Sequence, residues 1–136
     1  MNKLSMAQKS REGAQWVREH GFIRYTRWAG PGSDKHCALG VVDRVYGLYS
    51  DLGAGWPLGW PFTNGSEETE ALVAALAKAL HHAPLEYRNA AHAVADWNNR
   101  LETTAQDLID LFEATALNLE IEALAEQPAE VPVPVA

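Results

Sequence analysis

The sequence predicts a mainly α-helical protein: a compact single-domain bundle of about five helices, with a short extended segment and a long Trp/Gly/Pro loop. Three observations lead to this fold class. Apolar residues recur at the three- and four-residue spacing of a helix face in several separate stretches. Glycine, proline and helix-capping side chains fall between those stretches. The chain has 136 residues, 47% of them apolar, which is enough to bury one core.

Residues 4–20 are expected to form the first helix, because their apolar side chains repeat with helical spacing and Gly21 suits the position after a helix end. Residues 22–28 are rich in aromatic and β-branched side chains. We expect them to be extended, although the sequence offers no obvious partner strand. The run Ala-Gly-Pro-Gly at 29–32 then breaks the chain.

A second helix is predicted over residues 35–49, with Ser33 or Asp34 as its N-cap. Residues 50–66 follow as a loop that contains four glycines and two prolines. A loop of this length in a compact domain is usually functional or mobile, and its tryptophans favour packing on the core or on a partner.

Three further helices are predicted over residues 67–82, 85–97 and 104–125. Glutamates occupy the first turn of the first of these, where they suit the helix dipole. The pair Asn98-Asn99 is expected to end the next one, and Thr103-Thr104-Ala105-Gln106 predicts a capping box before the last.

The domain is predicted to comprise residues 1–126. Residues 127–136 are expected to form a flexible tail, in which residues 131–135 alternate valine and proline.

Charge is distributed unevenly along the chain. Residues 1–47 carry eight Lys/Arg and four acids, and the remainder carries three bases and fourteen acids, for a net charge of −7. We expect the basic first part to pair with the acidic last helix, although it could instead meet an anionic partner. The net acidity argues against nucleic-acid binding.

Targeting signals and cofactor motifs are missing from the sequence. No stretch approaches the ~18 apolar residues of a membrane span, and the first residues contain no signal-peptide core. The single Cys37 excludes an internal disulfide. We therefore expect a cytoplasmic protein without membrane contact, cofactor or metal, and we leave its oligomeric state open.

The most suggestive chemistry surrounds Cys37. A cysteine in the first turn of a helix, beside Lys35 and His36, is favoured as a thiolate. A base and an orienting group would have to come from elsewhere, and His92 with Asp96 are candidates. This pattern predicts a Cys-dependent hydrolase or transferase. The alternative is that Cys37 is a small buried core residue.

Aromatic and basic side chains supply candidate binding residues. Arg24, Arg27 and Trp28 could stack on and charge-pair with an anion or nucleotide, although an alternating strand would divide the two arginines between its faces. In the long loop, Trp56 and Trp60 precede prolines in two similar tripeptides. Exposed tryptophans of this kind suit a protein interface.

A resemblance connects two motifs. The box Cys37-Ala38-Leu39-Gly40, preceded by Trp28, and the later Trp97-Asn98-Asn99 with its Thr-capped helix occur in this order. They resemble a family of small uncharacterised proteins of actinobacteria and their bacteriophages, built on a Cys-Ala-Leu-Gly box and a downstream Trp-Asn-Asp. The resemblance covers roughly residues 14–119 and departs at Asn99, where the pattern has aspartate. It implies a phage or actinobacterial origin and no established activity.

The sequence thus favours a small accessory protein that acts by binding a host protein or a small ligand. The alternatives are the Cys37 enzyme and an anion-sequestering module. The simpler structural role for Asn98 and Asn99 is to cap the C-terminal end of their own helix. A second role is that one of them bonds the start of the Cys37 helix and so joins the two motifs.

Overall fold

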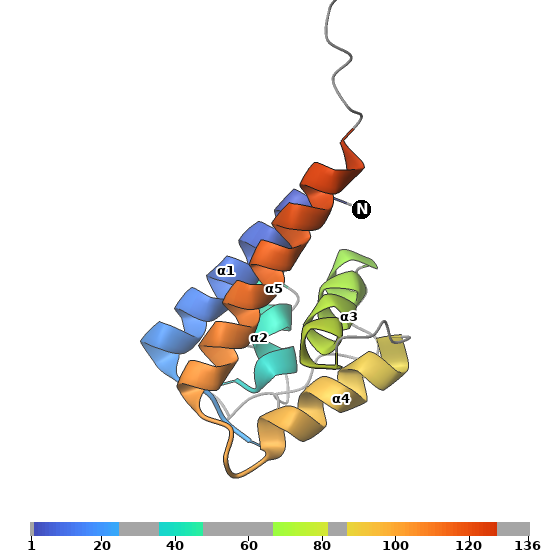
Figure 1. Cartoon of the computed structure of the whole chain (residues 1–136). Coiled ribbons are helices and arrows are strands. Elements are labelled where there is room, and N and C mark those ends of the chain that lie inside the picture. The colour runs from blue at the N-terminus through green and yellow to red at the C-terminus, as the bar shows by residue number, and fades with distance from the viewer. Residues whose placement is uncertain (1, 25–35, 48–66, 82–86, 128–136) are drawn as a thin grey trace, which may run out of the picture.

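The computed structural model describes residues 2–24, 36–47, 67–81 and 87–127, and in these ranges it is helical without a sheet (Figure 1). This confirms the mainly α fold class. The helices are α1 (Lys3–His20), α2 (Ala38–Val45), α3 (Glu67–His81), α4 (Tyr87–Asn99) and α5 (Ala105–Glu126). The predictions for Arg27, Trp28, the long loop with Trp56 and Trp60, and the tail after Gln127 lie outside the described residues.

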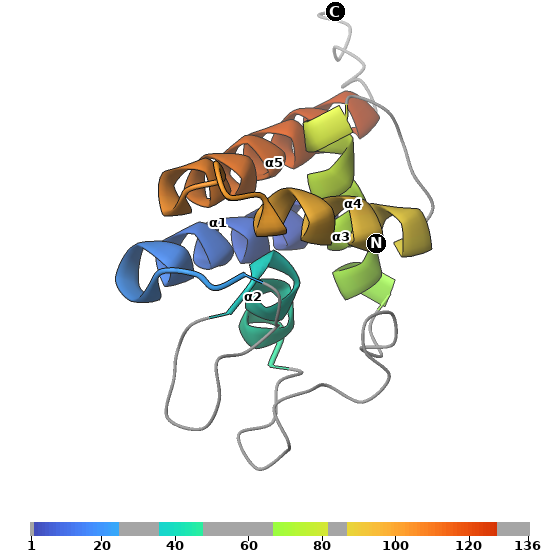
Figure 2. The same cartoon turned by 90° about the horizontal axis from the view of Figure 1, so that it is seen from below.

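The helices enclose one core. The long helices α1 and α5 run antiparallel side by side, α3 packs on α4, and α2 lies against α1, α3 and α4 (Figures 1 and 2). The side chain of Phe112 on α5 is fully buried between these helices, with Leu72, Leu76 and Val94 also fully buried. None of the helices in the described ranges is long and apolar enough to cross a membrane.

Helix α1 begins and ends close to the predicted positions. The side chain of Asn2 accepts hydrogen bonds from the backbone N–H groups of Leu4 and Ser5, at 3.0 and 3.1 Å, and so starts the helix one residue earlier than expected. Gly21 ends it with φ at +74°, and its N–H donates to the carbonyl of Val17 at 2.8 Å. Side chains other than glycine rarely adopt this φ, which explains the glycine stop.

Helix α2 is shorter than predicted. It spans Ala38–Val45 instead of residues 35–49, and Cys37 is its N-cap rather than a first-turn residue. The reason is tertiary, because the His36 carbonyl accepts a hydrogen bond from the N–H of Ile23 at 3.2 Å and keeps the backbone extended there. The assignment of Ser33 or Asp34 as the N-cap is therefore wrong for this helix.

The ends of α4 and α5 are each displaced from their predicted positions. Helix α4 continues through Asn98 and ends at Asn99, two residues beyond the expected stop. The capping box of α5 is shifted by one residue, because Thr104 and Asp107 exchange hydrogen bonds of 2.9 and 3.1 Å. The hydroxyl of Thr103 instead donates to the carbonyl of Trp97 at 2.7 Å and closes the turn between the two helices.

Removal of the capping box should weaken α5 measurably. We expect Thr104→Ala to lower the free energy of unfolding by about 1 kcal/mol, because the N–H of Asp107 loses its acceptor. Urea unfolding followed by circular dichroism measures this change. The control is Thr104→Ser, which keeps the hydroxyl and should stay within about 0.5 kcal/mol of the original protein. Equal losses in both variants would contradict the cap.

Ion pairs connect α1 to α5, as the charge distribution predicts. Lys3 pairs with Glu122 and Glu126, Arg11 with Glu120, and Arg18 with Glu113. These pairs are partly exposed to solvent, which screens them, so each contributes little to stability. Their main effect is to fix the antiparallel direction, since a parallel α5 would place its acids away from these bases.

Candidate functional site

A buried asparagine joins the two motifs identified in the sequence. The side chain of Asn98 on α4 has no exposed surface. Its Oδ1 accepts a hydrogen bond from the N–H of Ala38 at 3.0 Å, and its Nδ2 donates to the carbonyl of Ile23, also at 3.0 Å. This confirms the prediction that Asn98 or Asn99 bonds the start of the Cys37 helix. It replaces the expectation that Asn98 ends its own helix.

The segments that Asn98 bonds also contact each other. Phe22 and His36 form an isolated parallel bridge, supported by the hydrogen bond from Ile23 to His36. We call the residues 22–24, 36–38 and 98–103 the Asn98 junction. The junction fixes Arg24 and His36, the two described residues on either side of positions 25–35.

Arg24 belongs to the junction through its guanidinium group. Its Nε and one terminal nitrogen donate to the carbonyls of Arg100 and Leu101 at 3.1 and 3.2 Å, and the same nitrogen also donates to the carbonyl of Thr103. Its guanidinium carbon lies 5.0 Å from the centre of the Phe22 ring. Arg24 thus ties the chain after α1 to the turn between α4 and α5, and these donors are engaged by the fold.

Aromatic and basic side chains alternate where α1 meets α2, beside the junction. Trp16 is half-buried, with the His20 ring centre at 4.2 Å, the His36 ring centre at 5.8 Å and the Arg44 guanidinium 4.9 Å from its ring centre. Sequence reasoning missed this group. The i, i+4 spacing of Trp16 and His20 was the available signal, since such residues meet on one helix face.

Tyr46 extends the same face beyond α2. The ammonium of Lys9 lies 5.7 Å from the centre of its ring. Burial raises the pKa of the Tyr46 phenol above its ordinary value, and the carboxylate of Glu68 adds to the rise. The phenol therefore stays neutral and serves as a packing group under physiological conditions.

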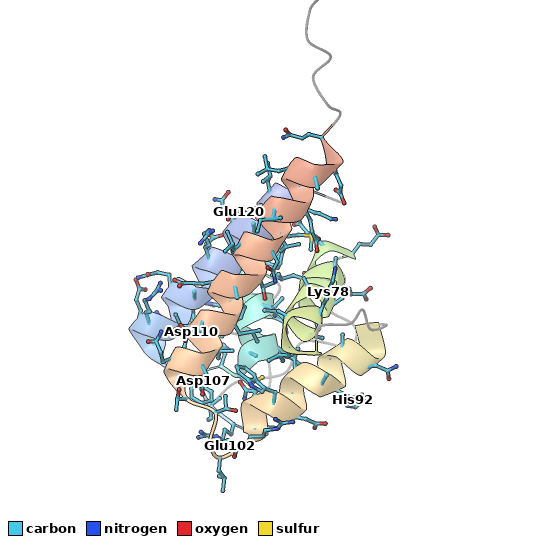
Figure 3. All side chains as sticks on the ribbon, in the orientation of Figure 1. Lys78, His92, Glu102, Asp107, Asp110 and Glu120 are labelled. Atoms are coloured by element: carbon cyan, nitrogen blue, oxygen red, sulfur yellow. The ribbon has the colours of Figure 1, made fainter. Side chains whose placement is uncertain are left out.

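The structure brings together some of the candidate catalytic residues and separates others. Cys37 and His36 are buried, at 7% and 1% exposure, and lie beside Asn98. His92 and Asp96 are both exposed on α4, and Figure 3 shows His92 on the outside of this helix. Asp96 precedes Asn98 by two residues, which is about 200° around a helix, so this pair points away from the junction. In the described residues, no group of three His, Cys, Asp or Glu side chains could hold a metal ion.

The thiol of Cys37 should be protected in the folded protein. We expect iodoacetamide to alkylate it at least about 100-fold more slowly in the native state than in urea at the same pH, because reaction requires local opening. Mass spectrometry of the alkylated chain over a pH series measures this. Fast native reaction with an apparent pKa below the free-thiol value of about 8.5 would instead support the enzyme alternative.

The described residues also form a groove away from the junction and a hollow that shares residues 100, 102 and 103 with it. A groove of about 590 Å³ runs between α3 and α5, and a hollow of about 430 Å³ lies beside the turn between α4 and α5. The second is lined in part by Trp97 and Arg100 and by three acidic residues, Glu102, Asp107 and Asp110. The sequence analysis named neither hollow, because helical periodicity does not show how far two helices stand apart.

These features define a small all-helical domain whose motifs meet at a buried amide. The chain belongs to a family of unknown function, DUF6197, which matches residues 1–118. The match agrees with the predicted resemblance to an uncharacterised family. Comparisons with curated proteins and with solved structures found no match.

Proposed function

We propose that the protein is a small accessory protein that acts by binding a host protein rather than by turning over a substrate. The observation that supports this most is the pair of hydrogen bonds from Asn98 to Ala38 and Ile23. One buried amide thereby holds both flanks of positions 25–35. Binding residues commonly lie on segments that a rigid scaffold positions in this way.

The composition of the segments beside α2 supports the same proposal. Positions 25–35 include Arg27 and Trp28, and positions 48–66 include Trp56 and Trp60. Tryptophan and arginine are enriched among the residues that dominate protein interfaces. Both segments adjoin α2 in the sequence, so we assign the partner contact to the α2 side of the domain.

The two alternatives receive less support. A Cys-dependent enzyme would need a base and an orienting group near Cys37. The buried His36 lies beside it in the chain, but the exposed His92 and Asp96 point away from the junction. An anion-sequestering module would need Arg24, whose donors bond the turn between α4 and α5. The proposal also includes a cytoplasmic location, from the single cysteine, and a phage or actinobacterial origin, from the resemblance.

The decisive experiment compares partner capture by matched variants. Purified full-length protein carrying Trp56→Ala and Trp60→Ala is immobilised beside the original protein and beside Leu101→Ala. The control removes an apolar side chain that is 81% exposed but lies outside the assigned surface. Quantitative mass spectrometry of proteins captured from a bacterial lysate then ranks the bound proteins.

We expect one protein to be captured by the original chain and by Leu101→Ala, and to fall at least about tenfold with the tryptophan variant, as loss of an interface hot spot requires. Circular dichroism checks that all three proteins are folded. Equal capture by all three proteins, or no partner above an unrelated bait, would overturn the proposal.

A further inference from the structure

An uncovered apolar face lies on α5, opposite its core side. Helix α5 packs against α1 and α3 (Figure 1). A second face of the helix carries large apolar side chains that are exposed to water. Leu117, Ile121 and Leu124 are 53%, 55% and 67% exposed, and Ala114 is exposed one turn earlier. Their spacing of three, four and three residues places them in one row, which we call the α5 stripe. Isolated exposed leucines are ordinary, but a row of this kind marks an interaction surface.

The groove between α3 and α5 borders the stripe. Ala114 and Ile121 belong to its lining, together with the small residues Ala75 and Ala79 of α3. The groove also contains Thr115, which is 1% exposed and whose buried hydroxyl has no hydrogen-bond partner in the described part of the chain. The groove thus has small side chains at Ala75, Ala79 and Ala114 beside the large Ile121 of the stripe.

The edges of the stripe are electrically balanced. On the α1 side, Glu113 and Glu120 pair with Arg18 and Arg11. On the α3 side, Lys78 donates to Glu122 at 3.1 Å. Figure 3 shows Glu120 and Lys78 on these two sides of α5. The whole chain carries a charge of −7, yet between residues 113 and 122 of α5 each acid has a base beside it, and the acids Asp107 and Asp110 lie beyond the stripe, toward the start of α5.

We propose that the α5 stripe binds a second copy of this chain, with the two α5 helices antiparallel across a twofold axis. In an antiparallel pair, the numbers of any two facing residues add up to the same value, so one facing pair defines all the others. With Leu117 opposite Ile121 of the second copy, Ala114 falls opposite its Leu124. A large side chain then meets a small one at each end, where the groove leaves room, and two large ones meet at the centre.

The balanced edges favour a second copy over a different, charged partner. A chain with a net charge of −7 repels its own copies, so self-association needs a surface without excess charge. A basic or acidic partner would instead bind best to an edge that carries an excess of the opposite charge. The edges of the α5 stripe carry no excess of either charge. It also lies across the domain from α2, so dimerisation leaves the proposed partner surface free (Figure 2).

Two single variants test the surface. Sedimentation velocity of the full chain over a concentration series should show a reversible dimer. Leu117→Glu should raise its dissociation constant at least about tenfold, because a carboxylate then faces Ile121 of the second copy. The control is Leu101→Glu, which alters a leucine that is 81% exposed outside the stripe and should leave the dimer intact. Both substituted side chains are exposed in the monomer, and circular dichroism spectra of the variants should match that of the original protein if they are folded.

A mixture of two variants tests the register. Leu117→Glu and Ile121→Lys should each dimerise poorly alone. Mixed together, they place the introduced carboxylate of one chain against the introduced ammonium of the other on one side of the axis. The original contact between Leu117 and Ile121 is kept on the other side, so heterodimers should form. A chain that stays monomeric up to its solubility limit would overturn the proposal. So would a dimer insensitive to Leu117→Glu, or a mixture that does not restore association.

Discussion

Replacement of Asn98 by alanine should lower the free energy of unfolding by about 2–4 kcal/mol. The side chain is fully buried and bonds Ala38 and Ile23, on two segments that are far from it in the sequence. Truncation removes both bonds and leaves the N–H at the start of α2 without an acceptor. A buried polar group without a partner costs about 1–3 kcal/mol, more than the net gain from an ordinary hydrogen bond.

Urea unfolding followed by circular dichroism measures this loss. The matched control is Asn89→Ala, since Asn89 is an exposed asparagine of the same helix and its removal should change stability by less than about 0.5 kcal/mol. Asn98→Asp retains an acceptor for Ala38 but turns a carboxylate oxygen toward the carbonyl of Ile23. We expect it to remain destabilised. If Asn98→Ala matched Asn89→Ala, the junction would not hold the fold together.

The sequence predicts the helices well because their signals are local. The apolar period of α1 and the acidic first turn of α3 depend on neighbouring residues alone, and both helices lie where the period predicts. Helix α2 shows the limit of this reasoning. Its start is set by Asn98, sixty residues later, and no local pattern around Ser33 or Asp34 could show this.

The candidate site shows the same division. The order of the Cys-Ala-Leu-Gly and Trp-Asn-Asn motifs was enough to suggest a contact between them, and Asn98 makes it. The i, i+4 spacing of His92 and Asp96 correctly indicates a shared helix face. It does not indicate which face, and the buried face is the one that contains Val94 and Asn98. The spacing of two residues shows only that their side chains share one face of a helix. Which way this face points depends on how the helix packs in the fold, and the sequence pattern does not show that.

The close approach of α1 and α5 depends on a glycine, a residue that is unfavourable in the interior of a helix. Gly13 is buried in the middle of α1, where glycine costs up to about 1 kcal/mol relative to alanine. A Cβ atom at this position would lie 2.8 and 2.9 Å from two ring carbons of Phe112. The ring is fully buried and has little freedom to move. The glycine therefore allows the ring to lie directly on the α1 backbone.

Gly13→Ala should consequently destabilise the protein, although it improves helix propensity. The propensity gain is up to about 1 kcal/mol and overpacking of a buried ring costs about 1–3 kcal/mol, so we expect a net loss centred on about 1 kcal/mol. Thermal and urea unfolding of the variant measure the loss. A gain in stability would show that α5 shifts easily on α1.

A double-mutant cycle with Phe112→Leu identifies the cause. Leucine lacks the ring carbons that approach Gly13, so in this background the added methyl group should cost less or even stabilise through helix propensity. We expect a coupling of at least about 1 kcal/mol between the two substitutions, as is usual for residues in contact. Additive effects would instead mean that Gly13 is needed for its backbone and not for the ring. The presence or absence of the coupling thus separates steric contact between two helices from a property of α1 alone.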